Sequence, residues 1–108
     1  MKNERLASLM SFFEEEPHDP FNIYALALEY LKSDQREAAR YFEKLLDEHP
    51  AYLPTYYHAG ELFIQLEMLD KAGEIYQRGI ALALNQNNQK TYQELLRAYR
   101  TYQDELED

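Results

Sequence analysis

Apolar side chains recur along this 108-residue chain at intervals of three and four residues. That spacing places them on one face of an α-helix, so each run of such positions predicts an amphipathic helix. Four runs lie in the middle of the chain, over residues 23–31, 38–46, 56–64 and 72–80. Two more, over residues 6–13 and 92–102, predict helices at the two ends. The pattern therefore predicts an all-α fold of about six helices.

The four central runs form two copies of one pattern. A shift of 33 residues brings the first run onto the third, with Tyr24 on Tyr57, and a shift of 34 brings the second run onto the fourth, with Ala38 on Ala72. The one-residue change falls in the turn between runs, where a change of length costs little. A helix–turn–helix that recurs after about 34 residues indicates a repeat architecture.

Residues that start and stop helices agree with this division. Asp19 before Pro20, and Asp34, occupy places typical of N-cap residues, and Pro50 ends the second central helix. A polar stretch before residue 89 predicts a loop, and the last helix is predicted over residues 89–105.

Small and aromatic residues stand at fixed places in each copy, and with them the chain resembles the tetratricopeptide repeat family, as a short stand-alone protein of bacterial type. The resemblance rests on Leu26-Ala27-x2-Tyr30 and Ala38-x3-Phe42 in the first copy, and on Tyr56-x2-Ala59-Gly60-x2-Phe63 and Ala72-x3-Tyr76-x2-Gly79 in the second. Ile23, Leu45 and Leu84 depart from the family pattern. The small residues let paired helices approach closely, and the aromatic residues fill the space between successive hairpins.

The resemblance implies an α-α superhelix, or solenoid, of antiparallel helix hairpins. We expect a single domain over residues 1–108. Its expected parts are an N-terminal half-repeat helix (1–17), repeat 1 (20–50), repeat 2 (51–84) and a C-terminal capping helix (87–107).

Charge and composition exclude several classes of partner. Twenty Asp and Glu against eleven Lys and Arg give a formal net charge of −9, which argues against binding to nucleic acid or to an anionic membrane surface. There is no cysteine, no apolar run long enough to span a membrane, and no signal-peptide pattern. We therefore expect a cytoplasmic protein without disulfides.

The sequence shows no catalytic constellation. It contains no glycine-rich phosphate loop, no HExxH and no G-x-S-x-G. His58 and Glu61 are three residues apart on one predicted helix, but a side-chain ion pair, or no interaction, is favoured over a shared metal ion. We expect no enzyme activity, no metal site and no cofactor.

In the family that the chain resembles, the first helix of each pair lines a concave groove that binds peptides or partner helices. The resemblance thus implies that this chain binds a peptide segment or a partner protein. Arg97 and Arg100 would either meet a carboxylate of the ligand or pair with nearby acids. The groove residues implied are Phe21, Tyr24, Leu28, Tyr57, Glu61, Ile64, Arg97 and Arg100.

A structural role without a peptide ligand is the alternative. A short array exposes apolar edges at its first and last helices, and these edges could form a homodimer. The residues that would mediate it are Phe12, Phe13, Tyr99 and Tyr102.

Overall fold

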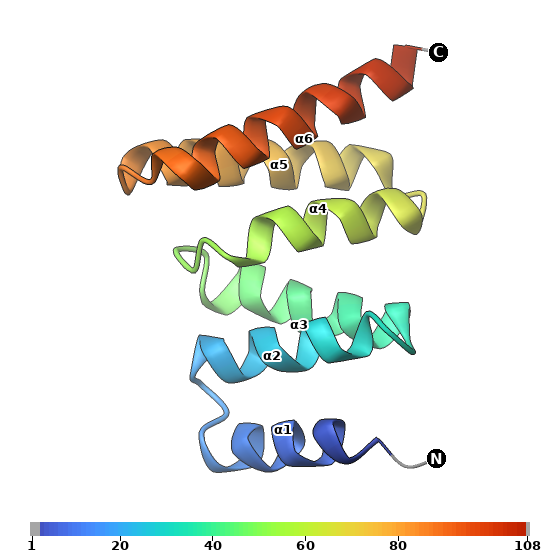
Figure 1. Ribbon diagram of the computed structural model, residues 1–108, viewed down its shortest axis with the longest axis vertical. Helices are drawn as coiled ribbons and strands as arrows, with labels where there is room; N and C mark the ends of the chain where they lie inside the picture. Colours follow the sequence, from blue (N-terminus) through green and yellow to red (C-terminus); the bar gives the residue numbers. More distant parts are fainter. Residues whose placement is uncertain (1–2, 108) are drawn as a thin grey trace. The chain divides into compact units, whose positions relative to one another are not determined.

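The structure is a computed structural model that describes residues 3–107, and over that range it contains six α-helices and no strand (Figure 1). The predicted all-α class of antiparallel helix hairpins, with six helices, is confirmed. The helices are α1 (Glu4–Glu15), α2 (Pro20–Tyr30), α3 (Gln35–Glu48), α4 (Thr55–Gln65), α5 (Leu69–Asn85) and α6 (Gln89–Glu107).

The chain divides into two compact units, Met1–Thr55 (unit 1) and Tyr56–Asp108 (unit 2). In unit 1, α2 packs against both α1 and α3. In unit 2, α5 packs against α6, and residues of α4 face side chains of α5. The single domain expected over the whole chain stays a prediction.

The predicted helix boundaries rest on identifiable hydrogen bonds. The Asp19 side chain accepts a hydrogen bond from the Phe21 N–H at 2.9 Å, and the Asp34 side chain accepts one from the Glu37 N–H at 3.1 Å. Each carboxylate satisfies an N–H group that the first helical turn leaves without a backbone partner. The last helix spans Gln89–Glu107: it begins where the pattern predicts it, extends two residues beyond residue 105, and ends where the predicted capping segment (87–107) ends.

The core of unit 1 lies between α2 and α3. Its fully buried apolar side chains are Ile23, Leu26, Ala27, Ala38, Phe42 and Leu45. By contrast, none of the side chains of α1 is buried, although the Phe13 ring contacts the Tyr41 ring edge-on at 5.8 Å. Unit 1 is therefore a well-packed hairpin with a more loosely attached first helix.

Glycine allows the helices of unit 2 to approach closely. A methyl group added at Gly60 would collide with the Tyr76 ring, and one added at Gly79 would lie 2.6 Å from the Tyr56 Cβ. At Gly73 the added group would meet the Tyr102 hydroxyl at 2.5 Å. The predicted role of Gly60, close helix approach, is confirmed, and two more contacts of unit 2 depend on glycine in the same way.

The two turns of unit 2 share one geometry. Glu67 after α4 and Asn87 after α5 have φ of 61° and 58°, in the left-handed region. After α4, the Met68 N–H donates to the Phe63 carbonyl at 2.8 Å, and an equivalent bond follows α5. Each turn satisfies a backbone carbonyl near the C-terminal end of the preceding helix and reverses the chain within three residues.

Candidate functional site

Three of the predicted groove residues line a cleft between α1 and α2, which we call the α1–α2 cleft. Its volume is about 290 Å³, and Phe21, Tyr24 and Leu28 form its apolar side. Phe21 is 61% exposed, whereas Tyr24 and Leu28 are half-buried. The remaining lining residues are Arg5, Ala25, Glu29 and Lys32.

A buried carboxylate forms the polar side of this cleft. Glu29 is 6% exposed, and its Oε1 lies 3.1 Å from Nε of Arg5 and 3.2 Å from Nζ of Lys32. Its Oε2 accepts a hydrogen bond from the Asn3 side-chain amide at 3.1 Å. The bond from Asn3 lowers the pKa of Glu29 most, and Lys32 and Arg5 lower it further. The carboxylate therefore remains charged and ties the start of α1 to α2.

Tyr24 is held in place by a residue of the segment between α3 and α4. Its ring packs edge-on against the Tyr52 ring, with centroids 5.7 Å apart. Burial raises the pKa of the Tyr24 hydroxyl, and the nearby Tyr52 raises it further. Tyr24 thus presents a neutral, positioned ring to the cleft, as an aromatic contact surface requires.

A larger cleft of about 580 Å³ lies between α4 and α6, and we call it the α4–α6 cleft. The predicted residues Tyr57, Glu61 and Arg97 line it together. Its other lining residues are His58, Glu94, Ala98 and Thr101. Glu61 lies on α4, and Glu94 and Arg97 lie on α6. Carboxylate acceptors and a cationic side chain therefore line one concave surface.

The guanidinium of Arg97 in the α4–α6 cleft is available to a ligand. Tyr57 is 36% exposed, and the negative charge of Glu61 is the largest cause that raises the pKa of its hydroxyl. Arg97 is exposed and makes no ion pair with any other residue in the range 3–107. Its guanidinium therefore retains donors for a carboxylate or a backbone carbonyl.

Ile64 and Arg100 lie apart from these two groups. Ile64 lines a smaller adjoining cleft of about 200 Å³, which shares Glu61 and Thr101 with the α4–α6 cleft. Arg100 is exposed on α6 and lines none of the three clefts. The partner-binding role of all eight predicted residues stays a prediction.

Sequence reasoning missed part of each cleft. It did not single out Glu29, which contacts Asn3 and Arg5 at the start of α1. On α6 it placed Arg100 on the groove side, whereas Glu94 and Ala98 line the cleft. The sequence feature that indicates which face of α6 lines the cleft is the apolar pair Leu95 and Tyr102. This pair is buried and fixes the rotation of the helix about its axis.

The described residues form neither a metal-binding cluster nor a membrane-spanning helix. Over residues 3–107 no group of three or more His, Asp or Glu side chains is placed to hold a metal ion. Within the same range no helix has the length and apolar character needed to cross a bilayer.

Solved structures of a repeat protein resemble this chain. A solution NMR structure of a tetratricopeptide repeat domain protein from Salinibacter ruber is 41% identical, with a TM-score of 0.76, over 81% of this chain and 89% of that chain. A crystal structure of a tetratricopeptide repeat domain protein from the same organism is 40% identical, with a TM-score of 0.76, over 79% of this chain and 97% of that chain. No family model and no curated protein matches the sequence.

Proposed function

Because this chain belongs to the tetratricopeptide repeat family, we propose that it is a protein-interaction module that binds a peptide segment or a partner protein. The family mediates protein–protein interactions in general. The observation that carries the proposal is the α4–α6 cleft, where Tyr57, Glu61 and Arg97 come from two helices to one concave surface. The α1–α2 cleft supplies a second, more apolar contact surface.

The α4–α6 cleft suits a polypeptide ligand. A peptide backbone presents alternating carbonyl acceptors and N–H donors. Arg97 offers donors to the carbonyls, Glu61 and Glu94 offer acceptors to the N–H groups, and the Tyr57 ring offers a flat surface to a side chain. A cleft of about 580 Å³ is in the size range of ligand sites in proteins.

Capture of a partner by variants of these residues tests the proposal. Immobilised protein is incubated with native lysate, and bound proteins are quantified by mass spectrometry. Tyr24→Ala with Tyr57→Ala, and separately Arg97→Ala, should each reduce specific capture about tenfold, as truncation of an interface anchor does. The helical content measured by circular dichroism should stay unchanged.

Phe12→Ala is the matched control, because Phe12 is an exposed aromatic residue (55%) that lines none of the three clefts described above. It should leave capture unchanged. Capture that is indifferent to Tyr24, Tyr57 and Arg97 would contradict the proposal.

A further inference from the structure

The α1–α2 cleft combines an apolar wall with an excess of positive charge. The side chains of Arg5 and Lys32 are 73% and 67% exposed, and both contact the same oxygen of Glu29. One carboxylate neutralises one of the two cations, so the rim retains a net charge of about +1. Arg5 uses only its Nε in this contact, and Lys32 has further N–H donors, so both keep donors for an acidic ligand. The apolar wall is Phe21, Tyr24 and Leu28.

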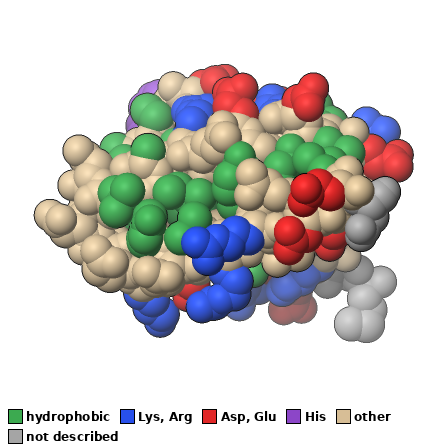
Figure 2. Space-filling view, turned by 90° about the horizontal axis from the view of Figure 1, so that it is seen from above, with side chains coloured by type: hydrophobic (Ala, Val, Ile, Leu, Met, Phe, Trp, Pro, Cys, Tyr) green, Lys and Arg blue, Asp and Glu red, His purple; other side chains and the backbone are tan. Residues whose placement is uncertain are grey.

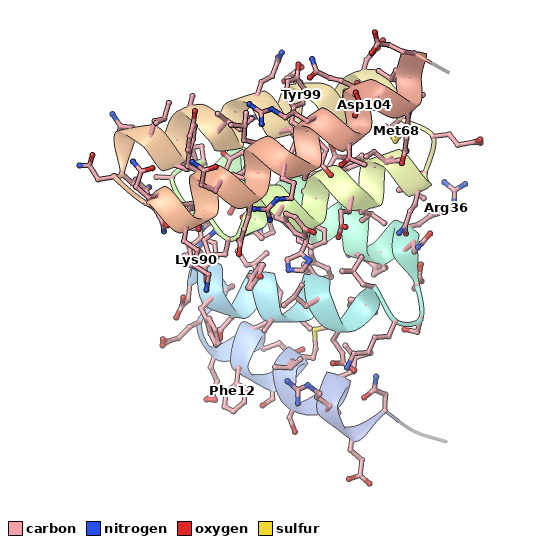
Figure 3. The ribbon with its side chains drawn as sticks, turned by 45° about the horizontal axis from the view of Figure 1, so that its top comes forward. Phe12, Arg36, Met68, Lys90, Tyr99 and Asp104 are labelled. Carbon is pink, nitrogen blue, oxygen red and sulfur yellow. The ribbon has the colours of Figure 1, made fainter. Side chains whose placement is uncertain are left out.

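The C-terminal end of α6 has the complementary character. Leu106 is 51% exposed, although it is a large apolar residue on a polar helix end. Four of the last five residues of the chain, in Asp-Glu-Leu-Glu-Asp, are acidic. Figure 3 labels Asp104 in the last part of α6, and Figure 2 shows several acidic side chains toward one end of the face that it views. An apolar side chain flanked by carboxylates matches an apolar wall flanked by cations.

We propose that the α1–α2 cleft of one copy of this chain binds the C-terminal end of α6 of a second copy. Leu106 would pack against Phe21 and Leu28, and the acidic residues beside it would face Arg5 and Lys32. This assignment rests on the proposed function, because it names the occupant of one of the two binding clefts.

The net charge of −9 opposes association between copies but does not cancel this contact. At physiological ionic strength the interaction between exposed charges is screened beyond about 8 Å. The proposed contact pairs Arg5 and Lys32 with carboxylates of opposite sign, so its attraction acts within this distance. The association is therefore weak and depends on a few residues.

The contact joins two different surfaces, the α1–α2 cleft of one copy and the C-terminal end of α6 of another. A single contact therefore leaves one cleft and one α6 end free in the pair, and these either bind each other or bind further copies. In both cases the average mass measured by light scattering should rise above the monomer mass as the concentration increases.

Peptide binding tests the contact directly on the intact chain. A fluorescently labelled peptide of residues 102–108 (Tyr-Gln-Asp-Glu-Leu-Glu-Asp) is titrated with the wild-type protein, and anisotropy reports binding. We expect saturable binding. A peptide with Leu106→Asp should bind about tenfold more weakly, because it loses the burial of a leucine side chain. A peptide with Asn and Gln in place of all acids should also bind more weakly, and equal binding of the three peptides would overturn the proposal.

Matched variants of the full chain test both sides of the contact. Phe21→Ala and Leu106→Asp should each abolish the rise of mass with concentration. Phe12→Ala and Leu84→Asp are the controls, because Phe12 and Leu84 have similar exposure (55% and 50%) but lie outside the proposed contact. Circular dichroism establishes that all four variants remain helical. A strictly monomeric wild-type chain, or controls as disruptive as the test variants, would overturn the proposal.

The outcome separates this proposal from the proposed function. If the peptide of residues 102–108 does not bind while partner capture still depends on Tyr57 and Arg97, self-association is wrong and the interaction module stands. If the peptide binds and partner capture is indifferent to Tyr57 and Arg97, the self-association is supported without the proposed role of the α4–α6 cleft.

Discussion

The two units are built on the same repeat pattern, yet their terminal helices are attached by different forces. In unit 1, α1 buries no side chain and is held by a polar network centred on Glu29, with one aromatic contact between Phe13 and Tyr41. In unit 2, α6 buries Leu95 and Tyr102 against α5. The attachment of α1 thus combines charge with half-buried apolar contacts, whereas that of α6 depends on buried aromatic packing.

The aromatic edge of unit 2 is dense. The rings of Tyr99 and Tyr102 stack at 5.8 Å, and each lies about 6 Å from the Tyr76 ring. The Tyr102 hydroxyl donates to the Leu69 carbonyl at 2.6 Å, and the Gln77 amide donates to the Tyr99 hydroxyl at 2.7 Å. Aromatic contacts with satisfied hydroxyls stabilise the α5–α6 pair without ionised groups.

Small residues differ between the units as well. All three glycines lie in unit 2, and where the repeat places Gly60 in unit 2 it places Ala27 in unit 1. In unit 2 the absence of a side chain at Gly60 leaves room for the Tyr76 ring. The family pattern requires only a small residue at this position, and both Ala27 and Gly60 satisfy it. In unit 2 the Tyr76 ring decides that glycine fits.

The largest effect is expected from filling the space beside Tyr76. Gly60→Leu should lower the free energy of unfolding by about 3 kcal/mol, because the side chain has to displace a buried aromatic ring. Urea unfolding measures the change. Glu74→Leu, at an exposed position of α5, is the control and should change stability by no more than about 0.5 kcal/mol. If Gly60→Leu and Glu74→Leu are equally stable, the described packing of α4 on α5 is wrong.

Acid should loosen the attachment of α1 more than that of α6. The pKa of Glu29 is below its usual value of 4.5 in the folded chain, so its contribution is complete above that value and is lost as the pH falls through the lowered pKa. Hydrogen exchange of α1 amides should accelerate over that range, whereas α6 amides should keep their protection because no carboxylate anchors Tyr102.

Glu29→Gln is the matched variant for this test, because it keeps the size of the side chain but cannot ionise. It should loosen α1 at neutral pH and remove the pH dependence of exchange that is specific to α1. Equal acid sensitivity of α1 in the variant and in the wild type would show that Glu29 does not control the attachment of α1.

The smallest effect concerns the turns of unit 2. Glu67 and Asn87 have the same left-handed backbone conformation, which asparagine adopts more readily than glutamate. Glu67→Asn should therefore stabilise unit 2 by about 0.5 kcal/mol, and the reciprocal Asn87→Glu should destabilise it by a similar amount. Thermal unfolding of the two variants checks the opposite signs. Shifts of the same sign would mean that the turn conformation does not limit stability.

Much of the fold was readable from the sequence because helix formation is governed by local spacing. Apolar positions three and four apart gave six helices, and Asp19 and Asp34 act as the predicted caps through bonds within three residues. The resemblance to the family also implied that Tyr57, Glu61 and Arg97 lie on one groove, and the structure brings these three together in one cleft.

Only tertiary structure decided the composition of the clefts, since it depends on how each helix is turned about its own axis. On α6 the burial of Leu95 and Tyr102 sets that rotation, so Glu94 and Ala98 reach the α4–α6 cleft and Arg100 faces solvent. Glu29 acquires its partners from Asn3 and Arg5, more than twenty residues away along the chain. Sequence spacing fixes which residues share a helix face, but side-chain packing between helices determines what that face meets.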